Sequence, residues 1–315
     1  MKISVSYLNG IFKCNDEQKK EDKKIKILIN DEKYPEILRN IKEPPKQLQY
    51  IGNIELLIKP GIAIIGSRNC TRYGKEMAIK FSKELSQYGL NIISGMAMGV
   101  DSYAHEGSLE VKGNTIAVLP SGLKNIYPRE NKKLFEKIID SNGLIISEYE
   151  DDFSATSETF LERNRIVSGL SIGILVIEGA YRSGTSVTAK LTIENNKKVF
   201  CVPSSLKNPK GYTPNHLIRK GGILVTCAED IIEEYKELNI MKRQEIETYS
   251  HFEEGNFHIK PEYQEIYETI EDEPTDINEI LKKTRMSLEQ VNYQLMMLEL
   301  EGYIISLPGK NYKRK

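Results

Sequence analysis

Two arginines lie close together in the segment Ile62–Gly74 (IAIIGSRNCTRYG), directly after a short apolar run. Ile62–Ile65 has the length and composition of a strand buried at the centre of a parallel sheet. The helix predicted near Tyr73–Tyr88 would turn its N-terminal N–H groups toward the carboxyl end of that strand, where open α/β sheets bind ligands and where an anion is favoured. The turn contains Gly66, Ser67, Arg68 and, at its far end, Arg72. It predicts phosphate binding; the alternative is a plain strand-to-helix junction with arginines exposed to solvent.

A second turn of this kind follows a later apolar run, in Glu178–Thr188 (EGAYRSGTSVT). Ser183, Gly184 and Thr185 stand where the next helix is predicted to begin, so they offer hydroxyls and backbone N–H donors to an anion without adding a positive side chain. An ordinary capping turn would use the same residues. Two such turns at one sheet edge favour anion binding.

Two further segments are predicted at the same edge. In Ser94–Asp101 (SGMAMGVD) the glycines permit close approach of the backbone, and Asp101 is expected to cap the helix that follows rather than to contact a ligand. The loop Leu119–Asn131 (LPSGLKNIYPREN) carries Lys124 and Arg129. It is either an ordinary solvated loop or one that contacts a polyanion.

The segment Phe160–Ser171 (FLERNRIVSGLS) brings cations to a helix start before another strand. Neighbouring helical residues point in different directions, so at least one arginine is expected to be structural and paired with Glu162 or Glu178. Phe160 is either a core aromatic or a platform on which an unpaired base stacks. The polar residues of this segment are Arg163, Asn164 and Arg165.

Composition narrows the class of protein. The chain has 315 residues, 39% of them apolar and 28% charged, with a formal net charge of −1, so binding to nucleic acid would need a local basic patch. Four widely spaced cysteines predict reduced thiols, not a disulfide or zinc framework. No signal peptide pattern and no apolar run of about 20 residues is present, so a cytoplasmic location without membrane contact is expected.

Catalytic motifs are missing from the sequence. It has no GxxxxGK[ST] loop, no HExxH, no GxSxG elbow and no dinucleotide fingerprint. The four histidines are scattered, and His105 is expected to be structural. We therefore predict no catalytic residue, no metal and no cofactor.

The elements that would position these turns alternate between strand and helix, which predicts an α/β fold with a Rossmann-like, doubly wound, mostly parallel sheet. Before them, Tyr34–Gly52 predicts a short helix and an extended strap. The expected strands are Ile62–Ile65, Asn91–Ser94, Thr115–Leu119, Leu144–Ser147, Ile172–Ile177, Lys198–Val202 and Ile223–Thr226.

Four regions are expected along the chain. They are an N-terminal extension (1–50), the Rossmann-like core (51–237), a polar linker (238–260) and a winged helix-turn-helix domain (261–315). In the last region, helices are predicted near Glu262–Thr269, Asp276–Lys283 and Ser287–Glu301, followed by a strand at Tyr303–Leu307.

The ordered set of motifs resembles the DNA-processing protein A (DprA/Smf) family of single-strand DNA-binding recombination mediators. The resemblance runs from about Tyr34 to the C-terminus. Its landmarks are YPEILRNIKEPPKQLQYIG, IAIIGSR, SGMAMGVD, LPSGLKNIYPREN, ISEY, ERNRIVSGLS, SGTSVTA, VFCVPSS and HLIRKGGILV.

The resemblance implies a core that holds single-stranded DNA on its basic edge, forms a homodimer and delivers the strand to the RecA recombinase. By motif, Arg68 would be the main phosphate ligand, with Arg163, Asn164, Arg165 and the Ser183–Thr185 turn beside the channel. The implied dimer surface falls within Asn215–Leu224 and includes Asn215, Ile218 and Leu224, although burial inside one subunit explains the same apolar pattern.

The C-terminal region differs from a typical duplex reader. Residues 261–315 contain five lysines and two arginines against eleven acidic residues, a net charge of −4, and Ser287–Glu301 contains no lysine or arginine. A helix that enters the major groove needs cations for phosphates and guanines. This region is therefore expected to serve protein contacts or domain packing, and only its tail (Lys310, Lys313, Arg314 and Lys315) to touch DNA.

An alternative is a nucleotide-binding enzyme or sensor of the lysine-decarboxylase-like phosphoribohydrolase group. Those enzymes typically show PGGxGTxxE, in which the glutamate is catalytic. The corresponding stretch here, EGAYRSGTSVTAK, has Ala189 and Lys190 and no glutamate after the turn. This departure disfavours the enzyme, whereas a sensor would use the same turns.

Overall fold

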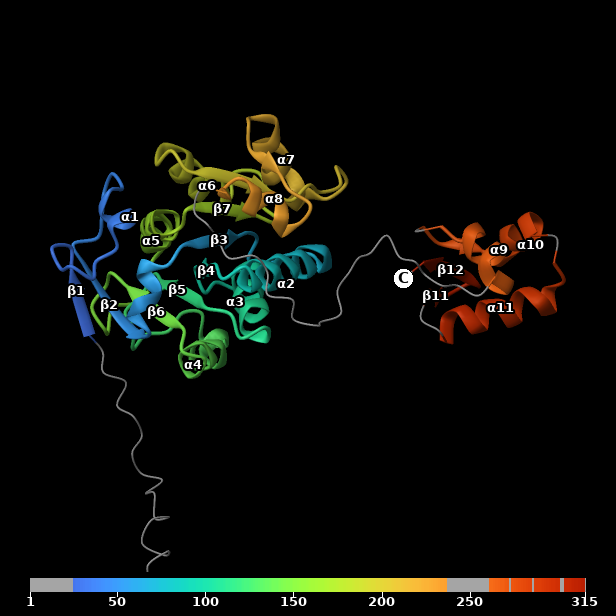
Figure 1. Cartoon of the computed structure of the whole chain (residues 1–315), viewed down its shortest axis with the longest axis horizontal. Coiled ribbons are helices and arrows are strands. Elements are labelled where there is room, and N and C mark those ends of the chain that lie inside the picture. The colour runs from blue at the N-terminus through green and yellow to red at the C-terminus, as the bar shows by residue number, and fades with distance from the viewer. Residues whose placement is uncertain (1–24, 237–260, 272, 285, 301–302, 315) are drawn as a thin grey trace, which may run out of the picture. The chain divides into compact units, whose positions relative to one another are not determined.

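The computed structural model describes residues 25–236 and 261–314, apart from 272, 285, 301 and 302 (Figure 1). The chain divides into two compact units, residues 1–246 and 247–315. The expected linker (238–260), Lys315 and the first 24 residues lie outside the described part, and the domain boundaries remain a prediction.

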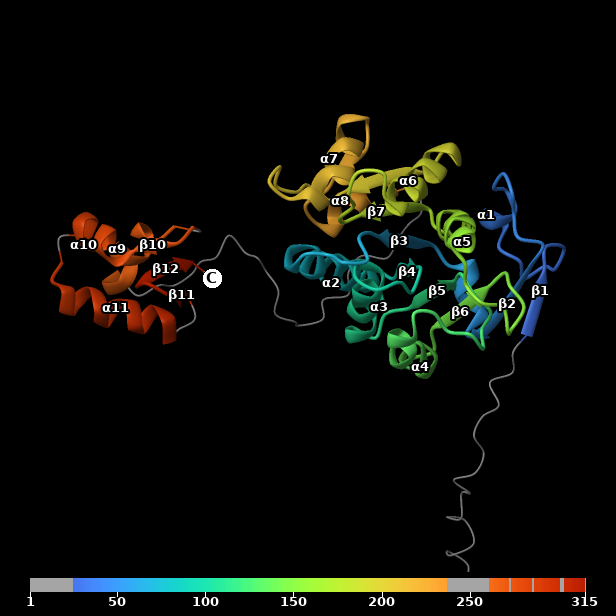
Figure 2. The same ribbon diagram turned by 180° about the vertical axis from the view of Figure 1, so that it is seen from behind.

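A nine-stranded sheet is the centre of the first unit, and its strands run parallel from β6 across to β9 (Figures 1 and 2). The order across the sheet is β1-β2-β6-β5-β4-β3-β7-β8-β9. The strands are β1 (Ile25–Leu28), β2 (Gln47–Gly52), β3 (Gly61–Ile65), β4 (Asn91–Ser94), β5 (Thr115–Leu119), β6 (Leu144–Ser147), β7 (Gly173–Val176), β8 (Lys198–Cys201) and β9 (Ile223–Leu224).

Helices cover both faces of this sheet because its central strands are apolar on both sides. Side chains of α1, α5 and α6 form one core with the sheet, and those of α2, α3, α4 and α8 pack on the other face. The helices of this unit are α1 (Glu36–Arg39), α2 (Arg72–Gln87), α3 (Val100–Glu110), α4 (Lys132–Asp140), α5 (Ser157–Leu170), α6 (Gly184–Glu194), α7 (Tyr212–Arg219) and α8 (Ala228–Glu233).

The doubly wound architecture confirms the fold class expected from the sequence, and all seven predicted strands are present. The strap predicted within Tyr34–Gly52 was wrong in part. After the short helix α1, the chain forms β2, which pairs antiparallel with β6, and β1 adds a further antiparallel strand. The pairing of β2 with β6 joins segments far apart in sequence, so local pattern did not reveal it.

The chain reverses its direction of travel across the sheet at β3. From β3 it moves outward through β4, β5 and β6, then returns to place β7 on the other side of β3. In open α/β sheets, ligands bind beside the carboxyl ends of strands at such a switch point. A ligand is therefore expected among the loops that follow β3, β4 and β7.

The described residues of the second unit form three helices and a small antiparallel sheet of order β10-β12-β11, around their own apolar core. Its elements are α9 (Pro261–Thr269), β10 (Thr275–Asp276), α10 (Ile277–Thr284), α11 (Leu288–Leu300), β11 (Ile304–Leu307) and β12 (Asn311–Arg314). Of the basic tail that was expected to touch DNA, Lys313 and Arg314 belong to β12. Arg314 donates through Nη2 to the carbonyl oxygen of Tyr267 at 3.2 Å.

No helix in the described part of the chain is long and apolar enough to cross a membrane.

Candidate nucleic-acid interface

A cavity of about 620 Å³ lies at the carboxyl ends of β3, β4 and β7, where the switch point predicts a ligand. Segments that are far apart in sequence meet in its wall. Nine of the thirteen residues expected to bind DNA line it: Gly66, Ser67, Arg68, Phe160, Arg163, Asn164, Ser183, Gly184 and Thr185.

Arg68 lies on an aromatic face within this cavity. Its Cζ atom is 4.4 Å from the ring centroid of Phe160, and that ring meets Tyr127 edge to face, with centroids 5.3 Å apart. A guanidinium stacked in this way keeps its N–H groups available for an anion. Phe160 is half-buried in the cavity wall, so it is not a core aromatic. Tyr127 was not among the residues expected at the site. Its position in the loop after β5 was the one feature of the sequence that could have indicated it.

Arg163 forms the floor of the cavity and is 4% exposed. Its Nη1 atom donates to the carbonyl oxygen of Val118 at 2.6 Å and also to that of Gly95. A Cβ atom at Gly95 would overlap the guanidinium, which explains why the position holds a glycine. Burial lowers the pKa of Arg163 to about 10, so it stays cationic at neutral pH and makes the floor positive.

Asp101 also lines the cavity, but it does not cap a helix as expected. The residue before α3 is Gly99, with φ 80°, and no side chain caps that helix. Asp101 lies within the first turn and accepts from the N–H of Gly95 at 3.1 Å. Burial raises the pKa of this carboxyl, although Arg163 opposes the shift.

The two helix N-termini at this edge differ in what they can bind. Glu178, which is fully buried, accepts hydrogen bonds from the N–H of Thr71 at 2.9 Å and from its hydroxyl at 2.5 Å. The Thr71 hydroxyl in turn accepts from the N–H of Gly74 at 3.1 Å. The N-terminus of α2 is therefore less favourable for an external anion than expected, because a carboxylate of the protein already lies there.

The N-terminus of α6 remains available. Ser183 precedes the helix with no side-chain capping hydrogen bond, and Gly184 and Thr185 form its first turn. The first N–H groups of a helix have no partner within the helix, and here they face the cavity that Arg68 lines.

Four expected cations lie outside the cavity lining, and three of them are on the exposed surface. The side chain of Arg72 is 93% exposed and pairs with Glu76 at 2.7 Å. Lys124 pairs with Asp151 at 3.2 Å, a contact that raises its pKa. Arg129 is exposed, in a 3₁₀ turn before α4.

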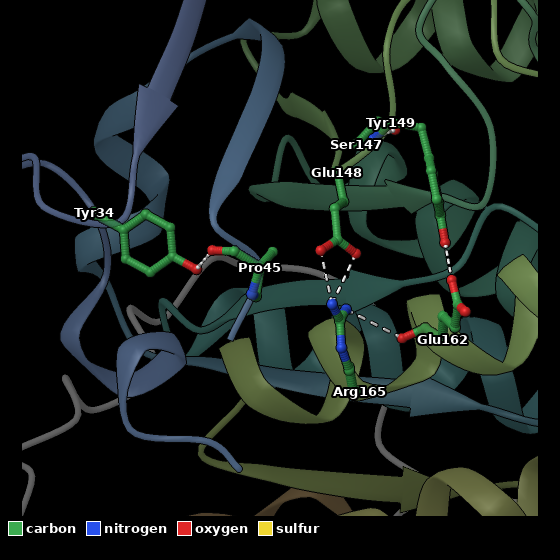
Figure 3. A network of polar contacts seen from close by, with 7 residues as sticks. All are labelled: Tyr34, Pro45, Ser147, Glu148, Tyr149, Glu162 and Arg165. Carbon is green, nitrogen blue, oxygen red and sulfur yellow. Dashed lines mark hydrogen bonds and ion pairs between the residues drawn. The ribbon is translucent and has the colours of Figure 1, made fainter. Parts of the chain in front are cut away.

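Arg165 forms an ion pair within the protein, as expected for at least one arginine of its motif. Its partner is Glu148, whereas Glu162 or Glu178 was expected. Its Nη2 atom contacts both carboxylate oxygens of Glu148, at 2.7 and 2.8 Å, in a half-buried pair (Figure 3). The carboxylate of Glu162 instead accepts from the hydroxyl of Tyr149 at 2.7 Å.

The residues expected at a dimer surface have different surroundings. Asn215 is bonded to the backbone of Ser204 through both its amide atoms, at 3.1 and 2.8 Å. Ile218 packs against the core on the α5 and α6 face of the sheet. Leu224, on edge strand β9, is 49% exposed.

The Arg165–Glu148 pair predicts a stability effect. Arg165→Met leaves the Glu148 carboxylate without its partner in a half-buried site, so we expect the free energy of unfolding to fall by about 1–3 kcal/mol. Urea denaturation measures this. Arg129→Met, at an exposed position, is the matched control, and an equal effect of the two substitutions would contradict the structural role.

Known proteins resemble this chain over most of its length. The family described as DNA recombination-mediator protein A matches residues 26–236, and the DprA winged helix domain matches residues 258–310. Protein Smf of Escherichia coli is 34% identical over 90% of this chain and 75% of its own length. DNA processing protein DprA of Bacillus subtilis is 39% identical over 68% of this chain and 72% of its own.

Two solved structures resemble the chain at a similar level. DNA processing protein A of Streptococcus pneumoniae has a TM-score of 0.65 and 35% identity, over 74% of this chain and 78% of its own. The Helicobacter pylori protein, whose structure describes a mode of single-stranded DNA binding, has a TM-score of 0.62 and 34% identity, over 69% and 97%. The family match over most of the first unit, with these relatives, shows that the chain belongs to the DNA recombination-mediator protein A family, known as DprA or Smf.

Proposed function

We propose that the cavity at the carboxyl ends of β3, β4 and β7 binds single-stranded DNA. The observation that carries the proposal is the position of Arg68, which lies on Phe160 in the same cavity as the open N-terminus of α6. A phosphate would contact the guanidinium and the N–H groups of Gly184 and Thr185. An unpaired base would stack on the exposed aromatic edge formed by Tyr127 and Phe160.

The arrangement favours a single strand over a duplex because the aromatic rings lie within a concave site. A paired base is stacked inside the double helix and does not reach such a ring. Binding through one arginine and one helix terminus recognises the backbone, so the affinity would be weakly selective for sequence and sensitive to salt.

We further propose that binding is the whole activity of this site, without a chemical step. Among the described residues that line the cavity, Asp101 is the single carboxylate, and it is buried and hydrogen-bonded to Gly95. His105 is fully buried, its Nδ1 atom lies 2.6 Å from the Thr115 hydroxyl, and burial lowers its pKa to about 3. Neither group is placed to activate a nucleophile in the cavity.

Arg68→Ala tests the site directly. We expect the dissociation constant for a fluorescein-labelled oligo-dT to rise about tenfold or more, because both the phosphate partner and its cation–π contact are removed. Fluorescence anisotropy at two salt concentrations measures this. Lys59→Ala is the control, since it removes one exposed cation near the amino end of β3, at the opposite edge of the sheet.

Two outcomes would count against this proposal. If Arg68→Ala and Lys59→Ala have equal effects, the strand does not use this cavity. If the wild-type protein binds no oligonucleotide at low salt, the cavity has another ligand, and a thermal-shift screen with free nucleotides becomes the next experiment.

We also propose that the protein forms a homodimer and delivers the bound strand to the RecA recombinase, in keeping with the mediator family to which it belongs. For the dimer surface we propose the edge strand β9 with α7, because Leu224 leaves an apolar side chain exposed at the end of the sheet. An unpaired strand edge with an apolar side chain is a site for association.

A charge on this edge tests the dimer. Leu224→Glu is expected to convert the protein to a monomer at micromolar concentration, because the interface would bury an unpaired carboxylate. Light scattering after gel filtration measures the mass. Leu206→Glu is the control, since Leu206 is 95% exposed in the loop after β8. A monomeric wild-type protein, or equal masses for both variants, would contradict this surface.

For the acidic second unit we propose a role in protein contacts. It has its own apolar core, so it is expected to fold separately. A protein that ends at residue 260 should bind oligo-dT with a dissociation constant within about threefold of the full chain, because the −4 unit adds no net attraction to phosphate. The same anisotropy assay measures this, and a loss beyond tenfold would show that the second unit contacts the strand.

A further inference from the structure

Three aromatic rings form a cluster on the surface next to the cavity. Tyr181 belongs to the loop after β7, and Tyr212 and His216 lie one turn apart on α7. The rings of Tyr181 and Tyr212 meet edge to face, with centroids 5.0 Å apart, and those of Tyr212 and His216 are nearly parallel at 5.6 Å. Tyr181 is 60% exposed and Tyr212 44%, although burial would stabilise both rings in the fold.

Two arginines belong to the same loop and helix as these rings. Residues 179–228 contain eight lysines and arginines and one acidic residue, Glu194, in a chain whose net charge is −1. The Cζ atom of Arg182 lies 5.1 Å from the centroid of the Tyr181 ring, and Arg219 is exposed at the end of α7. Exposed aromatic rings among cations are the combination with which proteins hold unpaired bases along a charged backbone.

The cluster continues directly from the cavity. Ala180 and Ser183, on either side of Tyr181 and Arg182, both line the cavity. Hydrogen bonds fix α7 against this loop: the N–H of Thr213 donates to the carbonyl oxygen of Gly179, and its hydroxyl to that of Ala180, each at 2.8 Å. A strand that leaves the cavity past the N-terminus of α6 therefore meets Tyr181 first.

The cluster lies on the exposed face of α7. Residues 212 and 216 share one face of α7. Asn215 and Ile218 lie on another face, where they bond to Ser204 and pack against the core.

We infer that Tyr181, Tyr212 and His216 form a second base-stacking surface, which takes further bases of the same single strand whose phosphate binds at Arg68. This inference rests on the proposed function. It extends the binding site from one concave cavity to a track along the loop after β7 and α7.

A fluorescent reporter tests whether bases reach the cluster. The chain contains no tryptophan, so Tyr181→Trp places a single reporter in the full-length protein. We expect oligo-dT of about 20 nucleotides to quench this fluorescence strongly, and an oligonucleotide of equal length without bases beyond its first six nucleotides to bind with little quenching. Ile58→Trp, at a 69% exposed site before β3, is the control and should not respond.

Affinities then separate this inference from the proposed function. The double variant Tyr181→Ala/Tyr212→Ala should weaken binding of the 20-mer about fivefold or more, and that of a six-nucleotide dT less than twofold. Tyr181→Phe/Tyr212→Phe, which keeps the rings, should restore the affinity for the 20-mer. Arg68→Ala should weaken both lengths.

Each outcome has a definite meaning. If Arg68→Ala weakens both lengths but the double alanine variant weakens neither and the fluorescence of the Tyr181→Trp variant is not quenched, the second stacking surface is wrong and the cavity site stands. If the wild-type protein binds neither oligonucleotide, the proposed function fails and this inference fails with it.

Discussion

A buried carboxylate, that of Glu178, holds the loops at this sheet edge together. Glu178 follows β7, yet it accepts hydrogen bonds from Thr71 at the start of α2 and from the side-chain amide of Asn208, which lies after β8. One side chain thus ties together loops from three neighbouring strands. Because it also supplies the negative charge that the N-terminus of α2 favours, it leaves the N-terminus of α6 and the side chain of Arg68 for a ligand.

Arg163 has the complementary role. A buried guanidinium is costly unless its N–H groups are bonded, and here carbonyl oxygens from the ends of β4 and β5 accept from it. It therefore holds two more strand ends in place while its charge stays under the cavity. The same residue supports the fold and makes the site positive, so neither role can be changed alone.

Local sequence pattern predicted the elements and the turns that meet at this sheet edge, but it did not predict which charged groups pair. The buried strands were visible as apolar runs, and the turns after β3 and β7 as glycine, hydroxyl and arginine residues. The pairing of Arg165 with Glu148, the Glu178 carboxylate at α2 and the antiparallel pairing of β2 with β6 all depend on contacts between separate segments. Lys124 shows the same limit, because Asp151, which pairs with it, belongs to the loop after β6.

The distribution of charge explains how a protein with a net charge of −1 could hold a polyanion. Residues 179–228 carry eight lysines and arginines against one acidic residue, and the rest of the chain, including the −4 of residues 261–315, offsets this charge. Attraction to DNA would therefore be local to part of the first unit. A site with few phosphate contacts has modest affinity by itself. Two subunits that hold the same DNA strand would bind it far more tightly, since the second contact becomes intramolecular. Under the proposed function, a dimer would therefore raise the affinity for DNA of a chain whose own net charge is −1.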